Sequence, residues 1–156
     1  NQRSTRILTK LLSWRRNQFQ RWLPNPMKKY FLDTNVILRF LLKDNEKYFN
    51  QARNYFEKAK KKEIELSLIP EVLFEIDYVL RGVYSLTKNE TVNILLKLVK
   101  TPYLKISPRG LLITTIDAYQ NTNVDLFDIY LYHYSLSKEA EVLSFDNDFE
   151  KIRNSS

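Results

Sequence analysis

The side chains best suited to chemistry in this sequence are carboxylates that follow short apolar runs. Asp33 comes directly after one such run and Asp146 after another, while Glu75 and Asp128 fall in the first turns of two expected helices. Ligands of an open parallel sheet bind at the carboxyl ends of its strands. If the apolar runs are strands of one such sheet, these four acids face a shared pocket at that edge.

An acidic pocket of this kind suits a hard divalent cation. Carboxylate oxygens are preferred ligands of Mg²⁺ and Mn²⁺. The chain has no cysteine and a single histidine, His133, which excludes thiolate sites and His-rich zinc sites. Only two glycines occur, and no Gly-rich phosphate loop is present. We therefore expect Mg²⁺ or Mn²⁺ at the pocket and a structural role for His133.

Several neighbouring acids have simpler interpretations. Glu71 is one helical turn from Glu75, so either side chain can face the pocket or water. Asp125 is expected to cap the helix that follows it, and Asp77 to be solvated. Asp148 is either the cap of the last helix or an outer acid of the pocket, two residues from Asp146.

The elements that must position these acids alternate along the chain. Short apolar runs predict strands, amphipathic segments predict helices, and Thr87 with Glu90 predicts a capping box. This alternation is typical of an α/β domain with a small, mostly parallel sheet. The expected strands are 28–32, 65–69, 103–106 and 142–145, and the expected helices are 35–42, 46–61, 70–84, 87–100, 107–119, 125–137 and a short one from residue 148.

Charge and length divide the 156 residues into a basic arm and one domain. Residues 1–26 hold six basic residues and no acid, so the rest of the chain carries 25 − 6 = 19 bases against 18 acids. The composition changes at Pro24 and Pro26, and we place the arm at 1–27 and the domain at 28–153. No apolar run reaches the roughly 18 residues of a membrane span, so we expect no membrane partner.

Four segments of the domain, taken in order, resemble those of PIN domains, specifically the VapC-like toxins of bacterial toxin–antitoxin pairs. The segment FLDTNVIL (31–38) is similar to the opening strand with its Asp-Thr-Asn signature. The family helix carries a Glu five residues after a Pro, and IPEVLFEIDYVLR (69–81) matches it in a way that selects Glu75 over Glu71. VDLFDIYLYHYS (124–135) resembles the segment of the third acid, and VLSFDNDF (142–149) resembles the Thr/Ser-x-Asp-x-Asp ending.

The resemblance implies a PIN-like three-layer α/β/α fold and metal-dependent endoribonuclease activity. It implies an RNA substrate, Mg²⁺ or Mn²⁺ as the cofactor, a cognate antitoxin and a cytoplasmic location, to which the absence of cysteine adds mild support. A homodimer face is offered by Tyr130, Tyr132 and Tyr134. The implied catalytic metal ligands are Asp33, Glu75, Asp128 and Asp146, and the residues that orient them are Thr34, Asn35, Ser144 and Asp148.

The implied chemistry fits these residue types. A phosphodiester is negatively charged, so an acidic pocket accepts it only with cations between the two. Divalent ions lower the pKa of an attacking water and neutralise charge in the transition state. Two alternatives are a PIN-like module that binds RNA or protein without catalysis, and a phospho-accepting receiver domain. The four acids argue against the first, and the second needs an adjacent acid pair where Leu32 and Thr34 flank Asp33.

The arm combines positive charge with two tryptophans, Trp14 and Trp22, which suits an RNA backbone and stacked bases. The arginines assigned to this contact are Arg15, Arg16 and Arg21. The arm can instead reach the acidic pocket as an internal inhibitor, or be an attachment without function.

Deletion of residues 1–26 distinguishes these roles of the arm. If the arm contacts RNA, its deletion should weaken RNA binding. It should also make the plot of log affinity against log salt concentration less steep, by up to about four units of slope, because each neutralised phosphate contributes about 0.7 to that slope on single strands. Inhibition predicts a faster enzyme instead. An unchanged affinity, salt slope and rate would exclude both functional roles.

Overall fold

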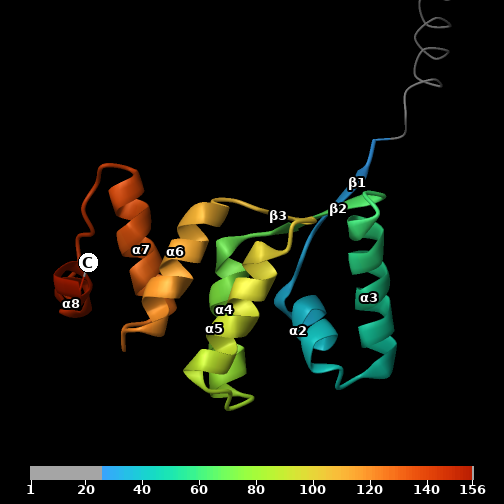
Figure 1. Ribbon diagram of the computed structural model, residues 1–156, viewed down its shortest axis with the longest axis horizontal. Helices are drawn as coiled ribbons and strands as arrows, with labels where there is room; N and C mark the ends of the chain where they lie inside the picture. The colour runs from blue at the N-terminus through green and yellow to red at the C-terminus, as the bar shows by residue number, and fades with distance from the viewer. Residues whose placement is uncertain (1–25, 156) are drawn as a thin grey trace, which may run out of the picture.

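The computed structural model describes residues 26–155, and within them the chain forms three strands and seven helices (Figure 1). The expected α/β class is confirmed. In chain order the elements are β1 (Lys28–Phe31), α2 (Thr34–Leu42), α3 (Glu46–Lys60), β2 (Ile64–Leu68), α4 (Pro70–Gly82), α5 (Lys88–Lys100), β3 (Leu104–Ile106), α6 (Arg109–Gln120), α7 (Leu126–Ser137) and α8 (Asp148–Ser155).

The three strands form a parallel sheet in the order β1-β2-β3. Tyr30 lies opposite Leu66, which in turn lies opposite Leu104. The β1–β2 ladder continues past the end of β1, where the Leu32 N–H donates to the Ser67 carbonyl at 2.8 Å. β2 is therefore the central strand, and Leu66 and Leu104 are each 1% exposed.

Local sequence signals fix where the helices begin. Asp33 caps α2 through its side chain, Pro70 occupies the first turn of α4, and α5 starts with the expected capping box of Thr87 and Glu90. In each case a side chain satisfies a free backbone N–H, or proline replaces it. The two helix starts nearest the sheet, those of α2 and α4, follow β1 and β2 almost directly and place Asp33 and Glu75.

The later helices extend in a row away from the sheet, from α5 through α6 and α7 to α8 (Figure 1). Each contacts the next through buried apolar side chains, including Leu95, Tyr119 and Ile129. α4 also contacts α7, so the core continues from the sheet into this helical part of the domain. The arrangement leaves α8 and the segment before it far from β1 in Figure 1.

The expected strand at 142–145 is wrong. This segment forms neither helix nor strand, and Leu143 and Phe145 are 97% and 105% exposed. A strand needs a neighbouring edge to satisfy its backbone groups. The segment instead follows α7, which packs on α6 and α4 away from the sheet (Figure 1). Its apolar composition marks it for burial, but no edge lies beside it.

β1 shows the complementary feature. One of its edges pairs with β2, and within residues 26–155 no strand pairs with the other. All four residues of β1 are exposed, and the Phe31 side chain reaches 75%. In this part of the chain the sheet thus has an unpaired strand edge, and segment 142–145 exposes two large apolar side chains, Leu143 and Phe145.

None of the helices in the described part of the chain is long and apolar enough to cross a membrane.

His133 lies on α7 and its ring faces α6, where its Nδ1 is 3.2 Å from Thr115 Oγ1. Burial lowers the pKa of His133, so the folded protein holds the imidazole neutral where the unfolded chain already binds a proton. The free energy of unfolding should therefore fall as the pH drops below about 6.5. Denaturant unfolding at pH 7.5, 6 and 5 should show a larger loss in the unaltered protein than in His133→Gln, whereas equal losses would contradict this role.

Candidate active site

The first acid of the site, Asp33, stands where the chain leaves β1 and enters α2. Its Oδ2 accepts the Asn35 backbone N–H at 3.3 Å, which is the side-chain cap of α2. The residue is exposed, although Leu32 before it and Thr34 after it are buried. These two buried neighbours hold the backbone in place, and the Asp33 carboxylate faces outward at the carboxyl end of the strand.

Thr34 joins this acid to the second one. Its buried hydroxyl donates to Glu75 Oε2 at 2.6 Å, a charge-assisted hydrogen bond between α2 and α4. Glu75 is itself exposed, so its other oxygen is open to a ligand. Glu71 lies in a different environment, near Tyr130 of α7. The pKa of Tyr130 is raised mainly by burial, then by Tyr134, and then by the charge of Glu71. The structure therefore associates Glu75, and not Glu71, with Asp33.

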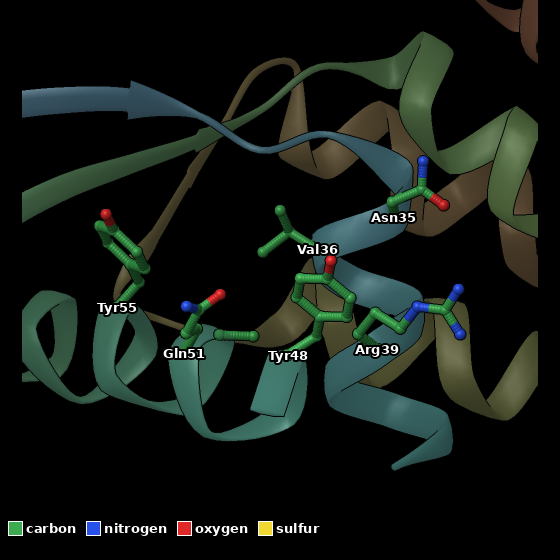
Figure 2. Close-up of a pocket in the computed structure, with 7 residues that line it drawn as sticks. Asn35, Val36, Arg39, Tyr48, Gln51 and Tyr55 are labelled. Atoms are coloured by element: carbon green, nitrogen blue, oxygen red, sulfur yellow. The ribbon is translucent and has the colours of Figure 1, made fainter. Parts of the chain in front are cut away.

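Asn35 lies at the rim of a cavity of about 460 Å³ between α2 and α3. Figure 2 shows Tyr48, Gln51 and Tyr55 rising from α3 below β1, with Val36 facing them from α2. The Tyr55 ring also packs edge-on against Tyr30 of β1, at 5.5 Å between centroids. The cavity thus adjoins the same strand whose second edge is unpaired.

The other two acids form a second group, at α7 and α8. Asp128 is half-buried in the first turn of α7, and its pKa is raised by burial and then by the charges of Asp125, Asp146 and Asp148. Ser144 Oγ accepts the Asp146 N–H at 3.0 Å, and Asp146 Oδ1 accepts the Asp148 N–H at 3.0 Å. Asp148 also pairs with Lys151. Ser144, Asp146 and Asp148 are therefore joined by local hydrogen bonds.

The four acids lie as two groups, Asp33 with Glu75 and Asp128 with Asp146. In the described residues, no three acidic or histidine side chains are close enough together to hold a metal ion. α4 and α7 do meet, since the Phe74 ring lies 5.5 Å from that of Phe127. Residues 142–145 lie outside the sheet, so Asp146 does not leave a strand beside β1, and Asp128 is placed by the packing of α7 on α4 and α6.

The donor chemistry of both groups fits Mg²⁺ or Mn²⁺. Each offers carboxylate oxygens, and in the first group the Thr34 hydroxyl holds one oxygen of Glu75. The raised pKa of Asp128 reflects burial together with an accumulation of negative charge that a divalent cation would relieve. The residues thus suit the ion, while the complete ligand set requires the two groups to approach one another.

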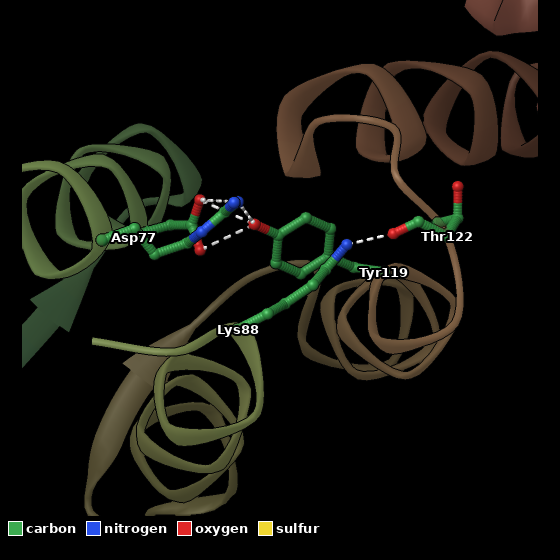
Figure 3. Close-up of polar contacts among 5 residues, drawn as sticks. Asp77, Lys88, Tyr119 and Thr122 are labelled. Atoms are coloured by element: carbon green, nitrogen blue, oxygen red, sulfur yellow. Dashed lines mark hydrogen bonds and ion pairs between the residues drawn. The ribbon is translucent and has the colours of Figure 1, made fainter. Parts of the chain in front are cut away.

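The expectation that Asp77 is solvated is wrong. Asp77 is 9% exposed, and the Tyr119 hydroxyl donates to both of its carboxylate oxygens at 3.1 Å (Figure 3). Burial raises its pKa, which the bond from Tyr119 partly offsets. The signal was present in the sequence, because Asp77 follows Ile76 on a helix face that also carries Leu73 and Leu80.

Asp125 also departs from its expected role. It stands at the N-cap position of α7, but its side chain makes no capping hydrogen bond, unlike those of Asp33, Asn45 and Thr87 at other helices. Its carboxylate is therefore not used by the helix.

The three arginines that the sequence assigns to RNA contact lie outside the described part of the chain, namely Arg15, Arg16 and Arg21.

No curated protein and no solved structure matches the chain. The PIN domain family, in contrast, matches residues 30–154, which span β1 through α8 and include all four acids. The match agrees with the parallel sheet and with an acid placed directly after its first strand. The chain therefore belongs to the PIN domain family.

Proposed function

We propose that this protein is a Mg²⁺- or Mn²⁺-dependent endoribonuclease and the toxin of a toxin–antitoxin pair. The observation that carries the proposal is the Thr34–Glu75 hydrogen bond, which holds a second carboxylate beside Asp33 at the carboxyl end of β1. Structural charge pairs in this chain join acids to bases, as Lys105 joins Glu65. An acid fixed by a neutral hydroxyl next to another acid is better suited to a cation.

Each residue has a defined role in the proposed reaction. Asp33, Glu75, Asp128 and Asp146 would together hold the metal, which would supply a water of lowered pKa and neutralise charge on the phosphoryl oxygens. Thr34 occupies one oxygen of Glu75, and the Asn35 N–H occupies one oxygen of Asp33, so the remaining oxygens point to the ligand. The Asp148 N–H occupies one oxygen of Asp146, and the Ser144 hydroxyl accepts the Asp146 backbone N–H.

The two acid groups join if residues 142–145 add to the free edge of β1 as a fourth parallel strand. An unpaired edge presents a row of backbone donors and acceptors that a parallel segment satisfies. Placing Asp146 level with Asp33 fixes the register, with Val142 level with Lys29. The C-terminal acids are then carried to the edge where Asp33 and Glu75 already lie.

This register also places the apolar side chains. Leu143 falls level with Tyr30 and Phe145 with Leu32, and side chains on one strand alternate between the two faces of a sheet. Leu143 and Phe145 therefore join the face on which Tyr30 packs against Tyr55 of α3. The cavity of about 460 Å³ between α2 and α3 adjoins this face and offers space for them.

The remaining parts of the proposal concern partners. The substrate is RNA in the cytoplasm, and an antitoxin segment silences the enzyme by placing an arginine or lysine among the acids in place of the metal. Arginine suits this role because its planar guanidinium engages carboxylates two at a time. The exposed Tyr134, stacked on Tyr130 at 5.7 Å, supports a homodimer face on α7.

The acids are tested by cleavage of total RNA with Mn²⁺, followed by sequencing of the cleaved ends. Asp33→Asn and Glu75→Gln should each lower the rate by about 100-fold or more, because each removes a metal ligand. EDTA should abolish cleavage, because it removes the metal itself. Thr34→Val should lower the rate by roughly 10–100-fold, since it orients a ligand without being one. Glu71→Gln is the matched control and should keep full activity.

Full activity in Glu75→Gln, beside an inactive Glu71→Gln, would contradict the assignment on α4. Folding is checked by denaturant unfolding without metal, where Asp33→Asn should be as stable as the parent or slightly more so, because a like charge is removed. A protein that binds RNA but cleaves none with Mn²⁺ would support the non-catalytic alternative.

Strand addition is tested with paired cysteines, which the cysteine-free chain makes unambiguous. Lys29→Cys with Val142→Cys should form a disulfide within one chain, since neighbouring strands lie about 4.8 Å apart and a disulfide tolerates about 4.4–6.8 Å between Cα atoms. The yield should rise with Mg²⁺, because the cation draws the acid groups together. Non-reducing electrophoresis and mass spectrometry measure it.

The matched control is Lys105→Cys with Val142→Cys. Lys105 lies on β3, at the other edge of the sheet, and should give little disulfide. Equal yields in the two pairs would contradict docking on β1, as would a disulfide that only links two chains.

A further inference from the structure

A second cavity, of about 490 Å³, lies between α4 and the start of α7. Its volume falls in the range of roughly 300–1,000 Å³ that small-ligand sites occupy. The same two helices carry Glu75 and Asp128, although neither of these acids lines the cavity. It is lined by Phe74, Asp77, Tyr78, Arg81, Gly82, Asp125, Leu126 and Phe127.

Aromatic rings form the open sides of this α4–α7 cavity. Tyr78 is 74% exposed and Phe127 is 51% exposed, which is unusual for rings that have a core within reach. Phe74 contacts the Phe127 ring edge-on, at 5.5 Å between centroids, and so fixes its orientation. Exposed and oriented rings are the surfaces on which unpaired RNA bases stack.

The inner side of the cavity is held rigid by a polar network (Figure 3). The Tyr119 hydroxyl donates to Asp77 and accepts from Arg81, which joins α4 to α6. Lys88 Nζ lies 3.9 Å from the centroid of the Tyr119 ring and donates to the Thr122 carbonyl. These contacts anchor the loop that leads into Asp125, so the cavity is largely formed before any ligand binds.

Asp125 is the group in this cavity that is available to a ligand. It lines the cavity, it is exposed, and its side chain does not cap α7. An ionised carboxylate only accepts hydrogen bonds, so it selects a partner that presents donors. Asp77, the other carboxylate, already accepts from Tyr119 and lies 4.0 Å from Arg81.

The charges around the cavity indicate which part of an RNA it accepts. Two acids, Asp77 and Asp125, face two bases, Arg81 and Lys88, so the site is close to neutral. A neutral site with aromatic sides favours an uncharged base over a phosphate. Among the four RNA bases, guanine alone presents two adjacent donors, N1–H and the N2 amine, on its Watson–Crick edge. These donors match the two oxygens of one carboxylate.

We propose that the α4–α7 cavity binds a guanine base of single-stranded RNA, with the base stacked on Tyr78 and Phe127 and its Watson–Crick edge on Asp125. The inference rests on the proposed function and specifies its substrate. The cavity lies between the two helices that carry Glu75 and Asp128, so the guanine would bind on the same helices as two of the proposed metal ligands.

The experiment measures binding by fluorescence anisotropy, using the full chain in EDTA so that no RNA is cleaved. The probes are short labelled oligouridines with one central G, A or inosine, the last of which keeps N1–H and lacks the N2 amine. The G probe should bind about tenfold more tightly than the A probe, with inosine between them. Asp125→Asn should reduce the ratio of G to A affinity to about one.

Stacking is tested separately from edge recognition. Tyr78→Ala should weaken binding of every probe by about tenfold, since stacking on an aromatic ring tolerates all bases, while Tyr78→Phe should bind as the parent does. Tyr48→Ala removes an exposed ring on α3, away from this cavity, and as the matched control should leave the affinity for every probe unchanged.

Three results would overturn the proposal: equal affinity for G and A, a G preference that survives in Asp125→Asn, or uniform binding that depends on Arg81 alone and so reports a phosphate. The measurement is independent of cleavage. A protein that prefers G through Asp125 but cuts no RNA with Mn²⁺ would retain this site and lose the proposed function. A protein that cuts RNA without this preference would keep the proposed function and lose this site.

Discussion

Within residues 26–155, β1 is paired along one edge only, and this constraint bears on the positions of the four candidate acids. The ladder with β2 extends through the Leu32 N–H, so the position of Asp33 at the carboxyl end of β1 is fixed. α2 begins at once, capped by Asp33 itself, and brings Thr34 against Glu75. The unpaired edge has the opposite effect on the C-terminal acids: with no strand beside β1, Asp128 and Asp146 stay with α7 and α8.

Sequence reasoning succeeded where local signals and tertiary packing agree. The Pro70 start of α4, the Thr87–Glu90 capping box and the strand before Asp33 all depend on neighbours within a few residues. The same reasoning failed for residues 142–145, because an apolar run shows that a segment favours burial without showing which edge is beside it. Asp77 was missed although Leu73 and Leu80 mark its face of α4 as apolar, because Tyr119, the partner that satisfies its buried carboxylate, lies 42 residues away.

The candidate site shows the same division. The association of Asp33 with Glu75 follows from two strands that are neighbours in the sheet, each followed by a helix, which the alternation of elements predicts. The hydrogen bonds among Ser144, Asp146 and Asp148 are local, since each joins residues two positions apart. What a single sequence does not contain is the relation between these two groups, because it depends on how α7 packs against α4 and α6 rather than on spacing along the chain.

Under the proposed function, the energetics of strand addition are close to balance, and charge then decides the outcome. Burying Leu143 and Phe145 would contribute about 3–6 kcal/mol. Fixing four residues in a strand costs about 4–8 kcal/mol in backbone entropy, which new ladder hydrogen bonds offset in part. Bringing Asp146 beside Asp33 and Glu75 adds repulsion of about 1 kcal/mol per close exposed pair. A divalent cation reverses the sign of that last contribution, so cation binding and strand addition must promote one another by linkage.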